Sequence, residues 1–380
     1  MIDEVIKGGY TMIIMNLELD NIYGFNDFRI NFSYPKKIVN SNIPNEHLKD
    51  CPKFRYKKAV ILMGANATGK TTLGRALLRI FGIIETGNPN YFTQMIRDKN
   101  KTARICIEFI NGEKILNRLT VSSEKDKSNS LLASIVYKYE SAPIRPTDTY
   151  EKVLLKMKTQ NLDEKMLSVG LTPYTGQIFY SFALDNEENN HQTYSTDPKL
   201  FLKVLKAVIG TLDPSLKDIS ILDGVENSYV IRRGSQEIIL QNNKLVNQNL
   251  LSSGTVRGVD IALLIASIIA NERGFYYCDE HFSYIQTDLE KRMFGIMIEH
   301  LQEDEQLIFT THNTDMLDLN IPKHSYAFLS RNIEGDEIKT SVMYASDVLK
   351  RNTDSIRCAA ANDVFSSIPD ESLLDSLSED

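Results

Sequence analysis

The chain has 380 residues, of which 42% are hydrophobic and 24% charged, and its formal net charge is −7 at pH 7. These values are typical of a folded protein with one large or two moderate domains, and the negative charge gives no overall attraction to nucleic acid or an anionic membrane. No run of about 18 apolar residues is present and the N-terminus is charged, so we expect no membrane span, no signal peptide and a cytoplasmic location. The cysteines form no Cys-x-x-Cys or Cys/His pattern, which indicates unpaired thiols and no structural zinc: Cys51, Cys106, Cys278 and Cys358.

The N-terminal region predicts a β-hairpin followed by a loop. Apolar side chains alternate with polar ones over residues 15–19 and 28–32, which is typical of two half-buried strands. Residues 36–58 contain Pro44 and Pro52 and show no sustained period, so we expect a loop there.

A glycine-rich loop then lies between an apolar run and a helical segment. Ala59–Met63 is typical of a buried strand and residues 70–84 of a helix. Between them, Gly64 and Gly69-Lys70-Thr71 fit the pattern G-x-x-x-x-G-K-[ST], in which backbone N–H groups surround phosphate oxygens, the lysine adds a positive charge and the hydroxyl faces Mg²⁺. We therefore predict an ATP phosphate site made of Gly64, Asn66, Ala67, Thr68, Gly69, Lys70, Thr71 and Thr72.

The middle of the chain predicts an antiparallel β layer and then a lobe. Strands are expected at 104–110, 114–122 and 131–140. Residues 142 to 216 are predicted to be mainly helical, with amphipathic spacing at 150–158 and 198–210. Because no heptads are sustained, we expect a compact lobe and no coiled-coil arm.

The last third of the chain alternates strands and helices and ends in short elements and an acidic tail. Expected strands are 218–222, 228–232, 237–240, 275–280 and 306–311. Expected helices are 256–270 and 288–303. The predicted fold class is α/β, a P-loop NTPase with a central, mostly parallel sheet, an antiparallel β layer and a helical lobe. We divide it into residues 1–141 (phosphate loop and β layer), 142–216 (helical lobe), 217–345 (the rest of the ATPase domain) and 346–380 (a C-terminal helical piece and tail).

Several polar residues lie at the ends of the later strands and helices, where we expect them to face the phosphate loop. Asp279 and Glu280 end a buried strand, so we predict that Asp279 binds Mg²⁺ and that Glu280 acts as the general base toward the attacking water. His312 ends the next strand and is placed to hydrogen-bond the γ-phosphate. Ser252, Ser253 and Gly254 directly precede a helix, where hydroxyls and the helix dipole favour phosphate; the simpler interpretation is a helix N-cap.

Four segments, GANATGKTT, LSSGT, the apolar strand to CDE, and TTHNTDML, occur in this order and resemble the ABC-type ATPase heads of the SMC, RecF and OLD group. The resemblance implies an ABC-ATPase head in which the LSSG segment of one head completes the ATP site of a second, so that ATP joins a head-to-tail homodimer or a higher oligomer. Within the group the chain is most similar to single-chain ATPases of bacterial anti-phage and abortive-infection systems. That similarity implies a separate effector protein, a nuclease or a toxin, and a DNA or phage trigger.

One segment departs from those relatives, which usually carry Ser-Leu-His after the acidic pair. This chain has Ser283-Tyr284-Ile285-Gln286, and Gln286 cannot become cationic, so we expect slow, regulatory hydrolysis. The glutamine that couples the metal to the lobe in such ATPases has two candidates, Gln94 and Gln177.

The first functional hypothesis is therefore an ATPase that controls an effector in anti-phage defence. The alternative is a RecF-like ATPase that clamps DNA, with the basic clusters at 53–58 and 97–104 lining the groove. A transporter subunit fits less well, because such subunits are usually shorter and lack the insertion between Arg104 and Gly210.

Overall fold

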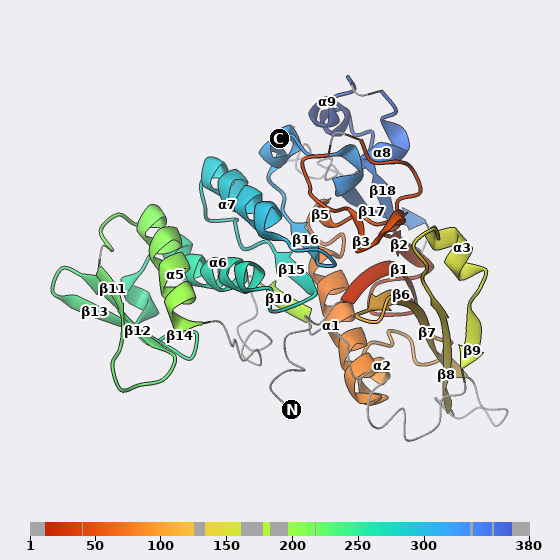
Figure 1. The fold of residues 1–380 in the computed structure, drawn as a ribbon, viewed down its shortest axis with the longest axis horizontal. Coiled ribbons are helices and arrows are strands. Elements are labelled where there is room, and N and C mark those ends of the chain that lie inside the picture. The colour runs from red at the N-terminus through yellow and green to blue at the C-terminus, as the bar shows by residue number, and fades with distance from the viewer. Residues whose placement is uncertain are drawn as a thin grey trace, which may run out of the picture.

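The computed structural model describes residues 12–39, 41–124, 134–160, 178–182, 197–216, 218–334, 337–351 and 353–366. Figure 1 shows a large body that contains two sheets and a smaller lobe that projects from one side at the end of helix α6 (Ser253–Ala270).

The body is built around a six-stranded sheet in the order β10-β15-β16-β5-β17-β18. The first five strands are parallel, and β18 pairs antiparallel with β17. The prediction of a central, mostly parallel sheet is therefore confirmed. Its strands are β10 (Ile178–Phe182), β15 (Phe275–Asp279), β16 (Gln306–Thr310), β5 (Ala59–Met63), β17 (Tyr326–Glu334) and β18 (Glu337–Tyr344).

Both faces of this sheet are covered, which explains why β5, β15 and β16 are buried at every position. On one face Val60 and Leu62 pack with α1 (Lys70–Thr86) and with the second sheet. On the other face Ala59 and Ile61 pack with α6 and with α7 (Thr287–His300). Alternate residues of one strand thus belong to two hydrophobic cores, and the strand ends are held rigidly between them.

The second sheet is antiparallel and has the order β2-β1-β6-β7-β8-β9. It contains the predicted hairpin, β1 and β2, and the three predicted strands of the β layer, β6, β7 and β8. The strands are β1 (Met12–Asp20), β2 (Phe28–Asn31), β6 (Arg104–Asn111), β7 (Ile115–Glu124), β8 (Ser134–Pro143) and β9 (Lys158–Gln160). Short α2 (Asn90–Thr93) follows α1.

The lobe combines helix α5 (Pro198–Leu212) with a small antiparallel sheet. Its strands are β11 (Asp218–Ile221), β12 (Ser228–Arg233), β13 (Gln236–Gln241) and β14 (Lys244–Leu245), and η3 (Gln248–Leu250) leads from it to α6. Phe201 of α5 packs edge-on against Tyr229 of β12, with ring centroids 5.0 Å apart. The strands predicted between 218 and 240 are therefore confirmed.

Three predicted segments differ from the structure. In the described part of 142–216, the two predicted helices correspond to α3 (Tyr150–Leu154) and α5, but β9 and β10 are strands that were not predicted. The predicted loop at 36–58 contains a small hairpin, β3 (His47–Leu48) and β4 (Cys51–Arg55). The predicted short C-terminal elements include the long strands β17 and β18 as well as η4 (Thr314–Asp318), η5 (Lys323–Ser325), α8 (Ala345–Val348) and α9 (Ile356–Ala361). The four-segment division stays a prediction, and the acidic tail from residue 370 lies outside the described residues.

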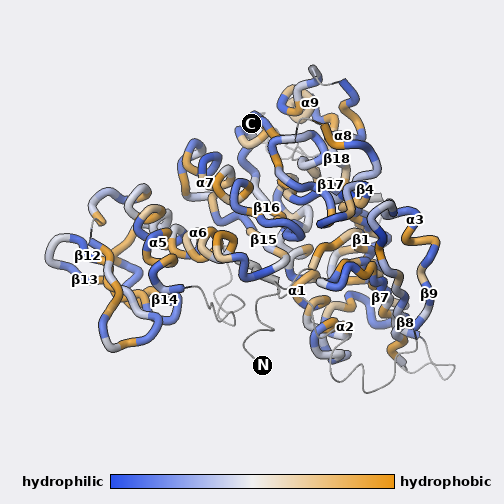
Figure 2. Tube along the Cα trace, in the orientation of Figure 1, coloured by the Kyte–Doolittle hydropathy of each residue, from blue (hydrophilic) through white to orange (hydrophobic). Residues whose placement is uncertain are grey.

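Helix α6 is, by length and composition, apolar enough to cross a membrane. Figure 2 shows apolar colouring along much of it. Most of the helix is buried inside the protein, with side chains such as Ile261 and Ile265 in the hydrophobic core, so its apolar character has a structural cause. The four cysteines are unpaired, as predicted.

Candidate functional site

The loop between β5 and α1 has a backbone that requires glycine at two positions. At Gly64 an added Cβ would lie 2.6 Å from the Leu329 carbonyl oxygen and 2.8 Å from the Thr68 hydroxyl. Gly69 has φ 109°, a value that L side chains rarely adopt. The chain therefore forms a tight loop at the N-terminus of a 17-residue helix, where backbone N–H groups and the helix dipole attract phosphate.

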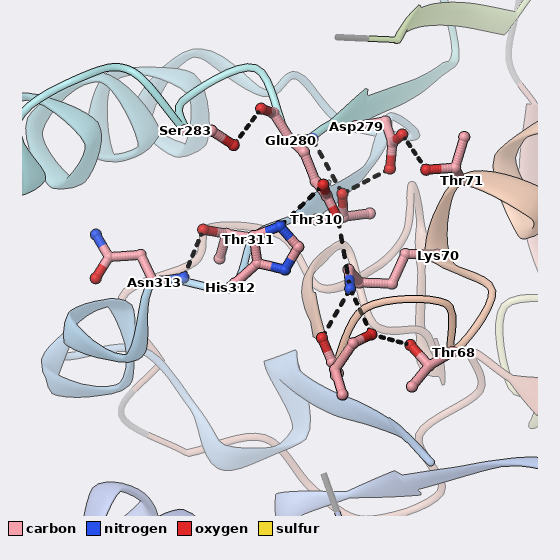
Figure 3. A network of polar contacts seen from close by, with 12 residues as sticks. Thr68, Lys70, Thr71, Asp279, Glu280, Ser283, Thr310, Thr311, His312 and Asn313 are labelled. Carbon is pink, nitrogen blue, oxygen red and sulfur yellow. Dashed lines mark hydrogen bonds and ion pairs between the residues drawn. The ribbon is translucent and has the colours of Figure 1, made fainter. Parts of the chain in front are cut away.

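Lys70 is held inside this loop, and its side chain is only 3% exposed. Its Nζ donates hydrogen bonds to the carbonyl oxygens of Gly64 (2.7 Å) and Ala65 (3.1 Å). It also lies 3.3 Å from Oε1 of Glu280 (Figure 3). A positive charge is thus fixed between the loop and the carboxylate at the end of β15.

Asp279 joins the phosphate loop to the neighbouring strands. Its Oδ2 accepts a hydrogen bond from the Thr71 hydroxyl at 2.6 Å, and its Oδ1 accepts one from the Thr310 hydroxyl at 2.8 Å (Figure 3). Burial raises the pKa of Asp279, although both hydrogen bonds act in the opposite direction.

The oxygens of Thr71 and Asp279 fit Mg²⁺, which prefers hard oxygen ligands and usually takes only one or two protein carboxylates beside phosphate oxygens and water. No group of three or more His, Cys, Asp or Glu residues that could enclose a metal ion occurs in the described part of the chain.

Glu280 is held by its backbone and by contacts with Lys70 and His312. Its φ is 53°, in the left-handed region, and its N–H donates to the backbone oxygen (3.3 Å) and the hydroxyl (3.1 Å) of Thr310. Burial favours the neutral acid, but the hydrogen bond to His312 and the charge of Lys70 outweigh it and lower the pKa of Glu280. The side chain is therefore a carboxylate at neutral pH, the form that accepts a proton.

His312 approaches Glu280 from the end of β16, with Nε2 2.9 Å from Oε2 of Glu280 and its side chain 41% exposed. The loop beside it is fixed by Glu290 of α7, which accepts hydrogen bonds from Thr311 and Asn313. Sequence reasoning missed both Thr310 and Glu290. Two features of the sequence could have indicated them. Thr310 is a polar residue at the end of a buried strand, and Glu290 is an acidic residue on the apolar face of a helix.

A pocket of about 560 Å³ opens beside the first residues of the phosphate loop. Gly64, Asn66, His312 and Arg357 of α9 are among the residues that line it. Arg357 is paired with Asp315 and Asp318, so its charge is already compensated.

Ser252, Ser253 and Gly254 do not join this network. Ser252 is the N-cap of α6, where its side chain accepts a hydrogen bond from the N–H of Thr255 at 3.2 Å, and Ser252 and Ser253 are exposed. Among the described residues, none of these three forms a hydrogen bond or ion pair with residues 64–72. The simple N-cap interpretation is therefore correct for the single chain, in which the Ser252 hydroxyl is bonded to Thr255 and both serines are exposed to solvent.

The remaining predicted residues of the phosphate site lie in the loop or in the first turn of α1. The Thr68 hydroxyl donates to the Ala65 carbonyl (2.8 Å), and Ala67, with φ 63°, has its carbonyl bonded by Arg331 of β17 (2.8 Å). Thr72 lies in the first turn of α1. Of the two candidate coupling glutamines, Gln94 is exposed at the end of α2 with no side-chain hydrogen bond to these residues, and Gln177 lies outside the described residues.

One of the basic clusters is partly internal. Lys57 and Lys58 are buried, and each Nζ donates to backbone carbonyl oxygens, that of Lys57 to Asn31 and that of Lys58 to Pro44 and Leu301. Arg104, in the other cluster, is paired with Glu18 at 3.0 Å. The surface charge proposed to line a DNA groove is therefore smaller than the sequence indicated.

Comparison with known proteins gives a family and a fold. The family described as "AAA domain, putative AbiEii toxin, Type IV TA system" matches residues 59–318. No curated protein matches the chain significantly.

Among solved structures, the chain is similar to an SMC head bound to the C-terminal winged-helix domain of ScpA (14% identity, 88% of this chain and 99% of that one, TM-score 0.50). It is also similar to an SMC head with an extended coiled coil from Pyrococcus furiosus (12% identity, 89% and 98%, TM-score 0.51). A RecF structure with ATP is more distant, at 10% identity, coverage of 89% and 97%, and a TM-score of 0.40. The two SMC matches show that the chain has the fold of an ABC-type ATPase head.

Proposed function

Because the chain belongs to this AAA-domain family, we propose that it is a cytoplasmic ABC-type ATPase that binds ATP with Mg²⁺, forms a head-to-tail dimer and controls a separate nuclease or toxin in anti-phage defence. The family description names a toxin of a toxin–antitoxin system, which supports the link to a defence partner.

One observation carries the proposal: a single chain holds two separate parts of a nucleotide site. Lys70, Asp279 and Glu280 converge at one edge of the central sheet. The exposed Ser252 and Ser253 at the N-terminus of α6 form no hydrogen bond with the phosphate loop. A second copy in head-to-tail orientation joins the two parts, since hydroxyls at a helix N-terminus favour an anion such as the γ-phosphate.

The residues of the chain have distinct roles in ATP hydrolysis under this proposal. Lys70 and the backbone N–H groups of the phosphate loop bind and orient the β- and γ-phosphates. Glu280 accepts the proton of the attacking water, and its carboxylate form is favoured by the charge of Lys70 and the hydrogen bond to His312. His312, which contacts Glu280 through Nε2 and is partly exposed, is proposed to donate a hydrogen bond to the γ-phosphate when ATP is bound. Mg²⁺, held by Thr71 and Asp279, would neutralise the charge that develops on the phosphate oxygens.

Hydrolysis is proposed to be slow. Gln286 is exposed at the N-cap of α7, directly after the loop that faces outward from the site. It hydrogen-bonds across an interface without adding a positive charge, which removes one source of transition-state stabilisation. A slow cycle suits a protein whose ATP-bound dimer is the active or inhibitory form of a switch.

The test is the mass of the purified protein in solution with and without ATP and Mg²⁺, measured on the Glu280→Gln variant to prevent turnover. We expect the mass of Glu280→Gln to double with ATP, and we expect the double variant Lys70→Ala/Glu280→Gln to stay monomeric. A Glu280→Gln protein that binds ATP and stays monomeric would overturn the dimer proposal. Co-expression with the neighbouring gene product tests effector control: a stable complex whose toxic activity changes with ATP supports it, and an activity independent of the ATPase contradicts it.

A further inference from the structure

We propose that Glu290 is a positioning residue for His312, which holds the histidine loop against helix α7 in the orientation that faces Glu280. This inference rests on the proposed ATPase function and assigns a role to a residue outside the phosphate-binding and metal-binding set.

The contacts fix the loop from both sides of the histidine. The Thr311 hydroxyl donates to Oε1 of Glu290 at 2.8 Å, and the Asn313 amide donates to Oε2 at 2.7 Å. His312 lies between these two anchors, and its own side chain is left to reach Glu280 (Figure 3). Both carboxylate oxygens of one side chain are thus used to orient the residues that flank a single histidine.

The polar groups around Glu290 are mutually satisfied. Glu290 is 1% exposed, and burial raises its pKa while the two hydrogen bonds favour its charged form. Asn313 also donates to the Thr287 hydroxyl (3.1 Å), and its side-chain oxygen accepts the N–H of Asp315 (3.0 Å). A network of this kind around a buried carboxylate favours one loop conformation, because another would leave Glu290 without these partners.

Helix α7 also connects this loop to the exposed segment that we propose to bind a second copy. The helix begins at Thr287, directly after the loop containing Tyr284, and the Tyr284 carbonyl oxygen lies 2.9 Å from where a Cβ on Gly254 would stand. The Tyr284 loop, the start of α6 and the helix that carries Glu290 are thus in direct succession or contact.

The first experiment is a double-mutant cycle on steady-state ATP hydrolysis. We expect Glu290→Ala to lower kcat about tenfold or more with KM for ATP nearly unchanged, and Glu290→Gln, which keeps one acceptor, to fall between Glu290→Ala and the parent. The Glu290→Ala/His312→Ala protein is expected to be no slower than His312→Ala, because Glu290 acts through His312. Multiplicative losses would overturn the proposal, and Asp288→Ala, on the exposed side of the same helix, is the matched control.

The second experiment needs no ATP hydrolysis and therefore separates this inference from the proposed function. Amide hydrogen exchange in the nucleotide-free protein should become faster in the peptide spanning 311–316 in Glu290→Ala and stay unchanged in Asp288→Ala. The N–H groups of Asn313 and Asp315 report it, since both are hydrogen-bonded within this loop. Exchange at 311–316 unchanged by Glu290→Ala would overturn the positioning role even if the protein is an ATPase.

Discussion

The Thr71 hydroxyl donates a 2.6 Å hydrogen bond to Asp279, a residue 208 positions later in the chain. Thr71 lies in the first turn of α1, which follows β5, and Asp279 ends β15; β5 and β15 are not neighbours in the sheet, because β16 lies between them. Thr310, at the end of β16, bonds the other oxygen of Asp279. Three adjacent parallel strands thus end at one small polar centre, which is where ligands bind in open α/β sheets.

This relationship predicts that loss of the Thr71 hydroxyl changes the Mg²⁺ dependence of ATP hydrolysis. Thr71→Val keeps the shape of the side chain and removes the hydroxyl, so ATP hydrolysis should fall at least about tenfold and require more Mg²⁺ for half-maximal rate. Thr71→Ser keeps the hydroxyl and should behave nearly like the parent. A Mg²⁺ titration of phosphate release checks this, and equal curves for the two variants would remove Thr71 from the metal site.

Lys70→Ala should abolish ATP hydrolysis and weaken ATP binding at least about tenfold. The substitution removes a buried side-chain cation that is hydrogen-bonded to the Gly64 and Ala65 carbonyls of the phosphate loop, and with it a charge-assisted contact to phosphate. Isothermal titration with a non-hydrolysable ATP analogue measures the loss. Lys203→Ala, at an exposed position of α5, is the control. Unchanged affinity in Lys70→Ala would contradict the phosphate-site assignment.

The arrangement of the candidate phosphate site could be predicted because its residues are local or follow directly from the alternation of strands and helices. Gly64 to Thr71 is a continuous motif, and Asp279 and His312 each follow a short apolar strand, so their meeting at one sheet edge was a consequence of parallel pairing. The hydrogen bonds of Glu290 to the residues beside His312 could not be predicted in this way. Glu290 lies one helix away, and only the packing of α7 shows that its carboxylate faces Thr311.

Two strands were not predicted from the sequence, for a related reason. The sequence Ile178–Phe182 is a short apolar run within a region of helical spacing, and it is a strand because it pairs in parallel with Phe275–Asp279, nearly 100 residues later. Tyr326–Glu334 is likewise fixed by pairing with β5, at Tyr326 opposite Ile61. Short runs carry little helix or strand preference of their own, so distant partners decide their conformation.

Gly254→Ala should disrupt the proposed dimer while leaving ATP binding to the single chain intact. The new Cβ would lie 2.9 Å from the Tyr284 carbonyl oxygen, so the loop at Tyr284 or the start of α6 must move. In the Glu280→Gln background we expect ATP-dependent dimerisation to weaken at least about tenfold, or about 1.4 kcal/mol.

The matched control is Gly295→Ala, a helical glycine of α7 with open space around the new methyl group. This change should raise helix stability by about 1 kcal/mol and leave dimerisation unaffected. Sedimentation or light scattering at several protein concentrations compares the two. If Gly254→Ala dimerised like Gly295→Ala, the contact between Gly254 and the Tyr284 loop would have no role in assembly.

Glu305 should make the free energy of unfolding depend on pH. Burial raises the pKa of Glu305 from its ordinary 4.5 to about 7. Between these values the folded chain holds a proton that the unfolded chain has released, so stability is fully present below pH 4.5 and is lost as pH rises through 7. The slope reaches at most about 1.4 kcal/mol per pH unit.

Glu305→Gln should remove this part of the slope. The amide stays neutral, and its oxygen can still accept the N–H of Gln302, which bonds Glu305 at 2.7 Å. The variant should therefore match the parent near pH 5 and become progressively more stable than the parent toward pH 7. Denaturant unfolding at pH 5, 6 and 7 measures the difference and stays below the titration of neighbouring Lys58, whose pKa burial lowers to about 8. The control is Glu303→Gln, at an exposed position, whose free energy of unfolding should change with pH as that of the parent does. If the free energy of unfolding of Glu305→Gln also changed with pH as in the parent, Glu305 would ionise in the folded protein as it does in the unfolded chain.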